Sequence, residues 1–464
     1  MNRSALDFSF ISGVPGVVWP ALPPAAGQAM LATQFQFDRS QWWPADTLRA
    51  WQLRQLRRLI AHTVANVSHY RDHLGHIGVE RAEDLTPESF LRWPLLEKRA
   101  IQMDAASIEA ATMPPGHGEM RLVVTSGSSG QPLRAATSDA AIFVQHALVL
   151  RGHLWFGFDF RAKFAAIRVS HDPIAVDNWG PPANATFRTG PMVINRVIND
   201  HGEQLEWLVR EKPAYLMSLN TNLRALLEES RRSGRSPKGL RAVIGFADMP
   251  APDMRELMRS SWGAEFFDTY SASEIGTIAL QCPEQPHLHV QSEHVLLEVL
   301  RADGTPCEPG ETGRVVVTDL QNFAMPLIRY ELGDYAALGG RCLCGRGLPV
   351  LERIVGRAGH LAIDPTGRTF FAHLNMGFWT TAAPILQRQI VQHTASKIEV
   401  RYVAARDLNA DECATLTREL RSAMRYDYEI VFTRMAKIER GAGGKFHDFL
   451  SLMPNPRSYP VHPL

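Results

Sequence analysis

Apolar and polar residues follow two different periods along this chain of 464 residues, and the periods predict its secondary structure. Between residues 45 and 73, apolar side chains recur every three or four positions among arginines, which predicts a helix with one packed face. Short apolar runs at 121–125, 164–170, 214–219 and 240–246 are typical of buried strands. Helical patterns at 204–212 and 222–230 separate the last three of these runs, and another helix is expected from near residue 138.

This alternation predicts parallel sheets covered by helices. At 295–317 two strand-like runs flank a glycine-rich turn, which predicts an antiparallel or barrel-like piece, and strand, helix and strand patterns follow at 398–403, 416–424 and 429–432. The predicted fold class is α/β, with a large N-terminal domain of helix-covered sheets plus a distorted barrel-like piece, then a small mobile α+β C-terminal lid. We expect a loosely structured leader over 1–40, the N-terminal domain over 41–356 and the lid over 357–464.

Composition narrows the function classes. Apolar residues make up 45% and charged residues 21% of the chain, the balance of a globular protein in water. The net charge of +1 provides no field that would recruit nucleic acid or an anionic membrane. Four prolines interrupt the apolar N-terminal stretch, so no signal peptide or membrane span is expected. Five sparse cysteines favour a reducing compartment, and we expect a cytoplasmic enzyme.

A run of small and hydroxyl residues follows the strand predicted at 121–125 and precedes the next predicted helix. Small residues let the backbone approach a phosphate closely, while hydroxyl and amide groups donate to its oxygens. An ordinary connecting loop is the alternative, because turns select the same residues. The residues are Thr125, Ser126, Gly127, Ser128, Ser129, Gly130, Gln131 and Pro132.

Four further elements could serve a nucleotide. In Tyr270-Ser271-Ala272-Ser273-Glu274, the aromatic ring can stack on a base and Glu274 can hold Mg²⁺, or the segment is a turn with a buried tyrosine. Asp334 follows Gly333 and could accept from ribose hydroxyls, or it is an ordinary turn residue. Arg357 after Gly356 could mark a hinge with a nucleotide-directed cation. Lys445 lies in a glycine-rich segment, or is simply a solvated lysine.

The order and spacing of the five elements resemble the adenylate-forming superfamily of acyl-CoA ligases, luciferases and peptide-synthetase adenylation domains. Within it, the chain is most similar to the phenylacetate–CoA ligase branch. The resemblance spans about residues 41–449 and is most specific over 270–357. It is carried by Tyr270-Ser271-Ala272-Ser273-Glu274, Cys282-Pro283-Glu284-Gln285, Ala324-Met325-Pro326-Leu327-Ile328-Arg329-Tyr330 and Cys342-Leu343-Cys344-Gly345-Arg346.

The resemblance implies a role for each element. The segment from Ser126 to Gly130 would hold the β- and γ-phosphates of ATP, Tyr270 would pack on adenine and Glu274 would ligate Mg²⁺. Asp334 would hold the ribose, and Arg357 would contact the nucleotide. Lys445, on the lid, would bridge the carboxylate and the α-phosphate, where charge neutralisation and alignment dominate catalysis. The implied catalytic residues are Lys445 and Glu274, and the implied nucleotide-binding residues are Thr125, Ser126, Gly127, Ser128, Ser129, Gly130, Tyr270, Ser273, Asp334 and Arg357.

The sequence departs from the family pattern in three places, one of which is that residues 364–371 lack the glycine-rich segment of typical CoA ligases. Gln131 stands where the family commonly has lysine, and Gly359 and His360 stand where it usually has two aspartates. These changes weaken CoA transfer more than adenylation. The acceptor could therefore be CoA or another thiol, with an amine or a carrier protein as the alternative. A relative that binds nucleotide or acid without catalysis is a further alternative.

Cys282, His289, Cys342 and Cys344 together provide three sulfurs and one imidazole, a set suited to a closed tetrahedral zinc site. Cysteines that are only buried small residues are the alternative. Similar ligases carry the same order of residues, which implies a structural Zn²⁺. His287 is a rival to His289 as the imidazole ligand.

The acid-binding region is expected between about residues 164 and 222, with 245–249 opposite it. The sequence does not rank the polar and aromatic residues of this stretch, and a structural role is favoured for each of them. The resemblance implies an aryl or other planar acid, and similar ligases imply a homodimer. The residues concerned are His171, Asp172, Trp179, Asn184 and Arg188.

Overall fold

The computed structural model describes residues 10–124, 133–169, 172–357, 361–371, 379, 382–439, 446 and 448–453. Its contacts divide the chain into two compact units, and each has its own core. The first unit comprises residues 1–297, 317–332 and 339–352, and the second comprises 298–316, 333–338 and 353–464. The division predicted at residues 41 and 357 stays a prediction.

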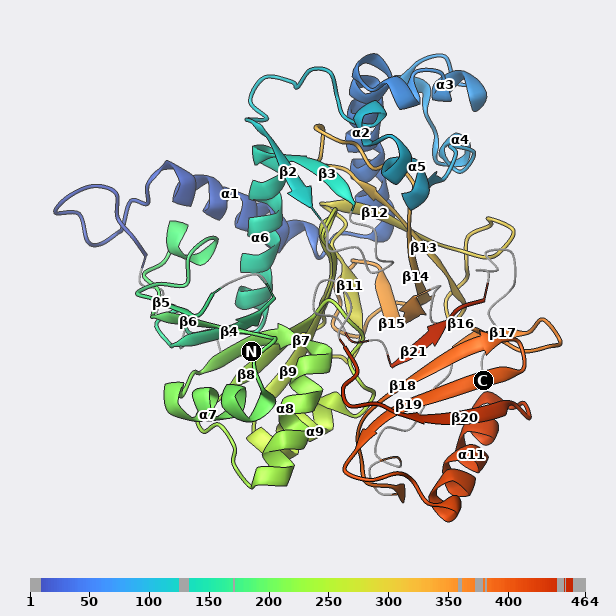
Figure 1. Ribbon diagram of the computed structural model, residues 1–464. Coiled ribbons are helices and arrows are strands. Elements are labelled where there is room, and N and C mark those ends of the chain that lie inside the picture. Colours follow the sequence, from blue (N-terminus) through green and yellow to red (C-terminus); the bar gives the residue numbers. More distant parts are fainter. Residues whose placement is uncertain are drawn as a thin grey trace. The chain divides into compact units, whose positions relative to one another are not determined.

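A parallel sheet forms the centre of the first unit (Figure 1). Its neighbouring strands run in the order β9-β8-β7-β4-β6, and all four pairs are parallel. Antiparallel strands extend it beyond β9 and beyond β6. The strands are β4 (Phe164–Arg168), β5 (Ile174–Val176), β6 (Met192–Arg196), β7 (Tyr215–Leu219), β8 (Ala242–Phe246), β9 (Glu265–Ala272), β10 (Gly276–Gln281) and β11 (Leu288–Val290).

Helices cover both faces of this sheet, which explains why its strands are continuous apolar runs. Ala165 and Ile167 pack with helices α7 (His201–Glu211), α8 (Asn220–Ser233) and α9 (Met254–Trp262). Phe164 and Ala166 point to the other face, where they pack with α1 (Ala25–Ser40) and α6 (Asp139–Trp155). Each parallel strand is therefore buried on both sides, and period-2 alternation assigns its residues to the two cores.

The predicted leader over 1–40 contains α1, which is a helix with buried positions and not a loose segment. Arg151 of α6 contributes to its attachment, because Arg151 donates to the Phe37 carbonyl over 2.9 Å and packs over the Phe37 ring. The same guanidinium contacts both carboxylate oxygens of Glu293 at 3.0 and 3.1 Å. Arg151 is 2% exposed, so this ion pair holds the helix from inside the core.

The other elements of the first unit are short, apart from one long helix. Strands β2 and β3 pair as antiparallel neighbours, and β1 pairs parallel with residues 330–331. The elements are α2 (Ala45–Asn66), α3 (His73–His76), α4 (Pro87–Phe90), α5 (Lys98–Met103), β1 (Leu96–Glu97), β2 (Met120–Val124) and β3 (Arg134–Ser138).

Four strands that follow each other in the sheet order contribute residues to both units. They are β12 (Val295–Leu300), β13 (Thr312–Asp319), β14 (Tyr330–Leu338) and β15 (Val350–Arg357). The strand, turn and strand pattern predicted at 295–317 corresponds to β12 and β13.

The second unit holds a four-stranded sheet in the order β20-β19-β18-β21 and the helix α11 (Ala410–Met424). The helix begins with a capping box in which Asn409 and Glu412 satisfy each other's backbone amides. Leu416, Leu420 and Met424 of α11 are fully buried in a core shared with the sheet. The strands of the unit are β16 (Leu361–Ile363), β17 (Thr369–Phe371), β18 (Ile385–Thr394), β19 (Lys397–Ala404), β20 (Glu429–Arg434) and β21 (Phe449–Ser451).

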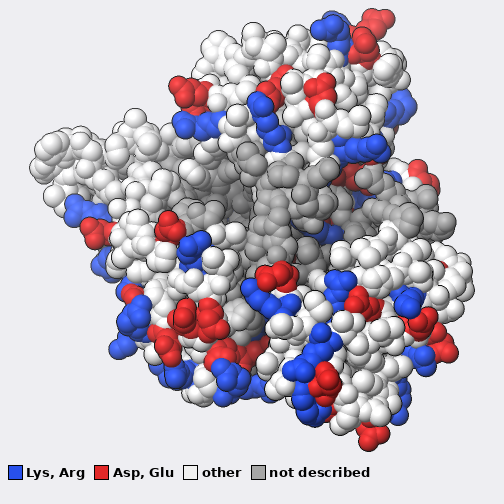
Figure 2. All heavy atoms as spheres, in the orientation of Figure 1, with Lys and Arg blue, Asp and Glu red and all other residues white. Residues whose placement is uncertain are grey.

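The predicted α/β fold class is confirmed, including the smaller α+β piece at the C-terminal end. Among the described residues, no helix combines the length and the apolar character that crossing a membrane requires. On the face shown in Figure 2, basic and acidic side chains of the described residues are interspersed, as the near-zero net charge predicts.

Candidate active site

Two of the five predicted nucleotide elements lie outside the described part of the chain. One is the segment with Thr125, Ser126, Gly127, Ser128, Ser129 and Gly130, and the other is the segment with Lys445. The described part also leaves out Gln131, His171, Gly359 and His360. The roles predicted for these residues stay predictions. On either side of the first element, Val124 of β2 pairs with Arg134 of β3. A second strand thus lies between this element and helix α6, where the sequence pattern suggested a direct passage to the helix.

Glu274 lies in the tight turn that joins β9 to β10. The hydroxyl of the fully buried Tyr330 donates a hydrogen bond to Glu274 Oε1 over 2.9 Å. The turn requires glycine at position 276, because its φ is +87° and a Cβ atom there would lie 2.5 Å from Gln145. One carboxylate is thereby held in place, and carboxylate oxygens are ligands that Mg²⁺ prefers.

The turn is also fixed from behind through the carbonyl of Ile275. Gln145 Nε2 donates to this oxygen over 3.1 Å, and His294 Nε2 lies 2.8 Å from it. The other ring nitrogen of His294 faces Asp319 Oδ1 at 3.5 Å, and both side chains are buried. Burial raises the pKa of Asp319, while the neighbouring imidazole opposes that rise. The turn that carries Glu274 is therefore fixed by contacts with Gln145 and the buried His294.

Tyr270 and Ser273, the other predicted nucleotide residues of this segment, differ in exposure. Tyr270 lies on β9 and is 8% exposed, whereas Ser273 is exposed in the turn. The sequence pattern predicted no role for Tyr330, His294 or Gln145. Only Tyr330 carried a signal, since it ends the run of residues from Ala324 that resembles the ligase branch.

Within the second unit, Asp334 and Arg357 form an ion pair. Arg357 Nε lies 3.1 Å from Asp334 Oδ1, and Asp334 is buried whereas Arg357 is partly exposed. The glycine before Arg357 is required by close packing, because a Cβ atom on Gly356 would lie 2.5 Å from the Phe371 ring. The structure thus brings together two residues that the sequence predicted to bind nucleotide, with the carboxylate oriented by the guanidinium.

Among the residues considered for the acid-binding region, Trp179 and Asn184 make contacts that hold the local fold. Trp179 is buried, donates from Nε1 to the Ala162 carbonyl over 2.9 Å and packs against Phe164. Asn184 donates to Asn178 Oδ1 over 3.1 Å. These contacts favour a structural role for Trp179 and Asn184. In addition, Asp172 lies 3.6 Å from Arg196, and Arg188 is exposed.

A polar cluster lies at the carboxyl ends of β7 and β8 and beside them on β9, where α/β sheets commonly bind ligands. The side-chain Nδ2 of Asn220 donates to Asp268 Oδ1 over 3.1 Å, and the backbone N–H of Asn220 donates to Asp248 Oδ1 over 2.7 Å. A side chain at Gly245 would collide with Asn220 Oδ1. This buried oxygen has no hydrogen-bond partner among the described residues. The ranges predicted for the acid-binding region contain Asn220, Gly245 and Asp248 but not Asp268.

Replacing Asp268 with asparagine is expected to stabilise the protein more at pH 8 than at pH 5.5. Burial raises the pKa of Asp268 to about 7, against about 3.9 in an unfolded chain. The folded state therefore binds the proton more tightly, and this group lowers stability progressively as the pH rises from about 4 to about 7. The full penalty, at most about 4 kcal/mol, applies above pH 7, and about 2 kcal/mol of it develops above pH 5.5. Urea unfolding of wild type and Asp268→Asn at pH 5.5 and pH 8 measures the difference in their free energies of unfolding. An equal difference at the two pH values would contradict the raised pKa of Asp268.

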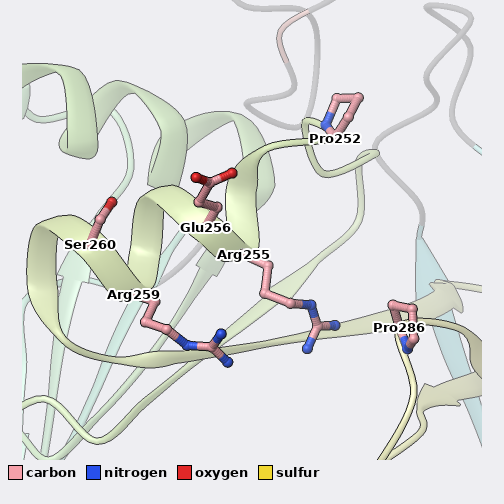
Figure 3. Close-up of a pocket in the computed structure, with 6 residues that line it drawn as sticks. All are labelled: Pro252, Arg255, Glu256, Arg259, Ser260 and Pro286. Atoms are coloured by element: carbon pink, nitrogen blue, oxygen red, sulfur yellow. The ribbon is translucent and has the colours of Figure 1, made fainter.

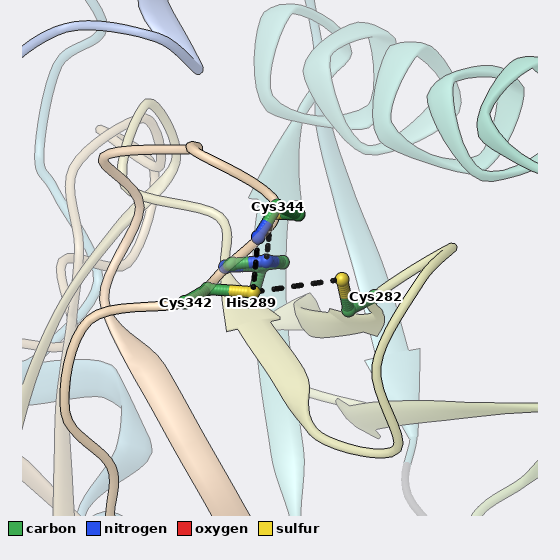
Figure 4. A group of neighbouring side chains, drawn as sticks. All are labelled: Cys282, His289, Cys342 and Cys344. Atoms are coloured by element: carbon green, nitrogen blue, oxygen red, sulfur yellow. Dashed lines mark hydrogen bonds between the residues drawn. The ribbon is translucent and has the colours of Figure 1, made fainter. Parts of the chain in front are cut away.

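Cys282, His289, Cys342 and Cys344 converge in the first unit, with their ligand atoms all within 4.8 Å of one another (Figure 4). Cys282 Sγ lies 3.9 Å from Cys342 Sγ, and His289 Nε2 lies 3.3 Å from Cys344 Sγ. Sulfur ligands 2.3 Å from one tetrahedral zinc ion are about 3.8 Å apart, so these distances fit such an ion. The four residues come from the β10–β11 segment and the segment before β15, which the strand pair β11–β15 already joins.

The orientation of His289 also suits a metal ligand. Its Nδ1 lies 3.3 Å from the Leu348 carbonyl, which directs Nε2 toward the sulfurs. Burial lowers the pKa of His289 to about 4, so the imidazole is neutral at pH 7. The rival His287 lies close as well, since its Nε2 is 2.9 Å from Cys342 Sγ. The structure therefore brings together all four predicted residues and places the rival beside them.

No protein-family model matches the sequence. Curated relatives include phenylacetate–coenzyme A ligases from Thermus thermophilus, Pseudomonas putida and Escherichia coli. The Thermus protein is 26% identical over 329 residues, which are 69% of this chain and 72% of the relative. The Pseudomonas protein is 25% identical over 68% of this chain and 72% of its own. The Escherichia protein is 24% identical over 72% of this chain and 76% of its own.

Solved structures match the fold at lower sequence identity. A 2-hydroxyisobutyryl-CoA ligase in the postadenylation state, in complex with 2-HIB-AMP, has a TM-score of 0.71 and 17% identity, covering 89% of this chain and 91% of the other. An anthranilate CoA ligase in complex with anthranoyl-AMP has a TM-score of 0.53 and 12% identity, covering 72% and 67%. The fold is therefore that of these ligases, which confirms the resemblance stated from sequence.

Proposed function

We propose that this chain, a relative of phenylacetate–coenzyme A ligases with the fold of adenylate-forming ligases, is itself an acid–thiol ligase. It would activate a carboxylic acid with ATP to an acyl-AMP, release pyrophosphate and transfer the acyl group to CoA. The observation that carries the proposal is the Glu274 carboxylate, held by Tyr330 in a turn fixed by the core. This turn lies in the segment that most resembles the ligase branch. An aryl or other planar acid is the substrate class we propose from that resemblance.

Each step of adenylation has a residue type suited to it. Glu274 would hold Mg²⁺, which neutralises the phosphates as the carboxylate of the substrate approaches. Tyr270 would pack on adenine, and Asp334, oriented by Arg357, would accept from the ribose hydroxyls. The segment 125–130 and Lys445 would hold the triphosphate and the reacting groups, as the resemblance implies.

We further propose that Cys282, His289, Cys342 and Cys344 hold a zinc ion. The support is geometric: the ligand atoms converge at distances that suit a tetrahedral ion, and a backbone carbonyl orients the imidazole. With all four positions taken by protein, the ion would have a structural role. The proposal also includes a cytoplasmic location and a homodimer, and light scattering on the purified protein tests the assembly.

The proposed function predicts carboxylate-dependent exchange of labelled pyrophosphate into ATP. A panel of aryl, heteroaryl and aliphatic acids should contain at least one acid that supports exchange well above the rate without acid. Adding CoA should then give a thioester that mass spectrometry detects. If no acid supports exchange, and Lys445→Ala leaves every rate unchanged, the chain is not an adenylating enzyme. Exchange without a CoA thioester would direct the search to amine or carrier-protein acceptors.

A further inference from the structure

A cavity of about 500 Å³ opens beside helix α9 in the first unit, apart from the residues assigned to nucleotide and metal. Arg255 and Arg259 lie one turn apart on α9 and extend their guanidinium groups toward the Pro286 side of the cavity, whereas Glu256 points away from them (Figure 3). The volume is within the range of small-molecule sites in proteins. The lining residues are Pro252, Arg255, Glu256, Arg259, Ser260 and Pro286.

The Pro286 wall of the cavity belongs to a short loop that backbone and side-chain hydrogen bonds close. The Cys282 amide donates to the His287 carbonyl over 2.8 Å. Gln281 Nε2 donates to the Gln285 and His287 carbonyls over 2.7 and 3.1 Å. The cavity therefore lies between a helix and a constrained loop, so a ligand could bind there with little ordering of the protein.

The two arginines differ in their partners. Arg259 Nη2 contacts both carboxylate oxygens of Glu265, at 3.1 and 3.0 Å. Arg255 makes no hydrogen bond or ion pair with any residue in the described part of the chain, although burial lowers its pKa. Two carboxylates act on the charge of Arg255: Glu265 is engaged by Arg259, and Asp268, whose pKa burial raises to about 7, carries only part of its charge at neutral pH. A cation partly removed from water without a full counter-charge is unfavourable, and an anionic ligand would offset that cost.

From this arrangement we propose that the cavity binds a phosphate group of CoA, with Arg255 as its principal contact. A guanidinium fork matches two phosphate oxygens, and Arg259 and Ser260 add donors on the same helix. This inference rests on the proposed function. The loop after β8 leads from the predicted acid-binding residues 245–249 directly into α9, so the proposed phosphate site lies on the segment that follows the acid-binding region. The phosphates of CoA are separated from its thiol by an extended arm, so they must bind away from the reacting carbon.

The kinetic test compares Arg255→Gln with wild type, using rates normalised to pyrophosphate exchange. The KM for CoA should rise about tenfold, the effect of losing one charged hydrogen-bonding contact. The KM for pantetheine, which has no phosphate, should not change. Dephospho-CoA, which lacks the 3′-phosphate, identifies the group that Arg255 contacts. If wild type and Arg255→Gln have the same KM for dephospho-CoA, the contact is to the 3′-phosphate. If the substitution raises this KM as much as it raises the KM for CoA, the contact is to the diphosphate. Arg231→Gln, an exposed arginine of α8, is the control matched for charge. Equal KM values for CoA in wild type and Arg255→Gln would overturn the proposal.

A binding test separates this inference from the proposed function. Calorimetry with adenosine 3′,5′-bisphosphate, which has no thiol, is performed with a non-hydrolysable ATP analogue at saturation. Wild type and Arg231→Gln should bind this probe about tenfold more tightly than Arg255→Gln. Arg255→Lys should give an intermediate affinity, since lysine keeps the charge but loses the fork. Equal affinity in all four proteins would overturn the phosphate site even if the exchange reaction succeeds. Failure of exchange with every acid would overturn the enzyme function and leave this measurement interpretable.

Discussion

Replacing Glu274 with glutamine is expected to lower acid-dependent pyrophosphate exchange by about 100-fold or more. Glutamine has nearly the same shape and can still accept the hydrogen bond from Tyr330, so the turn between β9 and β10 should keep its structure. What the substitution removes is the negative charge that would hold Mg²⁺ beside the phosphates. The magnitude is that of losing one electrostatic contact to developing charge. The measurement is the exchange rate at saturating ATP and acid over a range of Mg²⁺ concentrations.

Tyr330→Phe is the matched comparison, because it removes the hydrogen bond and keeps the carboxylate. Its effect should be about tenfold or less, the value of one hydrogen bond to a charged group. Glu274→Gln should also shift half-saturation to higher Mg²⁺, and a purely structural defect would not do so. Exchange within a few-fold of wild type at every Mg²⁺ concentration would exclude Glu274 as the metal ligand. A lower thermal midpoint with a normal Mg²⁺ response would assign it a structural role.

The predicted elements that match the structure best are those whose sequence period and burial agree. The runs at 214–219 and 240–246 became β7 and β8, because parallel strands covered on both faces need apolar residues at every position. The helix predicted over 45–73 ends at Asn66, because the pattern of apolar residues continues past an extended residue, Val67, into a separate 3₁₀ turn over Ser68–Tyr70. The helix over residues 25–40 was not predicted, because α1 is attached through Arg151 and Glu293, more than 100 residues away.

In the candidate site, too, contacts between residues far apart in the sequence could not be predicted. The grouping of Cys282, His289, Cys342 and Cys344 could be predicted from residue types and their order, and the structure brings the four together. The role of Glu274 stays a prediction. The contacts that orient Glu274 could not be predicted, because Gln145, His294 and Tyr330 come from separate elements that only the folded sheet brings together. Within the described part of the chain, Arg255 has no ion-pair partner while Arg259 contacts Glu265, and this difference depends on three-dimensional packing and not on spacing along α9.

Replacing Cys342 with serine is expected to remove the bound zinc and lower the thermal midpoint by on the order of 10 °C. Four ligands from two chain segments would share one ion, so losing a ligand removes a cross-link between the β10–β11 segment and the segment before β15. We expect a loss of about 3–5 kcal/mol, part of the free energy that structural zinc contributes to folding. Metal analysis and differential scanning fluorimetry, with and without a chelator, measure both effects. Cys413→Ser, on α11 and outside the cluster, is the control.

Two histidines, His289 and His287, are candidates for the imidazole ligand of the proposed zinc ion. His289 should be the ligand, because its Nδ1 lies near the Leu348 carbonyl and its Nε2 faces the sulfurs, the arrangement that fixes a metal-binding tautomer. His289→Ala should therefore lose zinc as Cys342→Ser does, and His287→Ala should keep it. The reverse result would make His287 the fourth ligand, consistent with its contact to Cys342 Sγ at 2.9 Å. If wild type purifies without zinc and does not bind the added ion, the cluster is a group of buried thiols. The constraint on the Pro286 loop would then come from its hydrogen bonds alone.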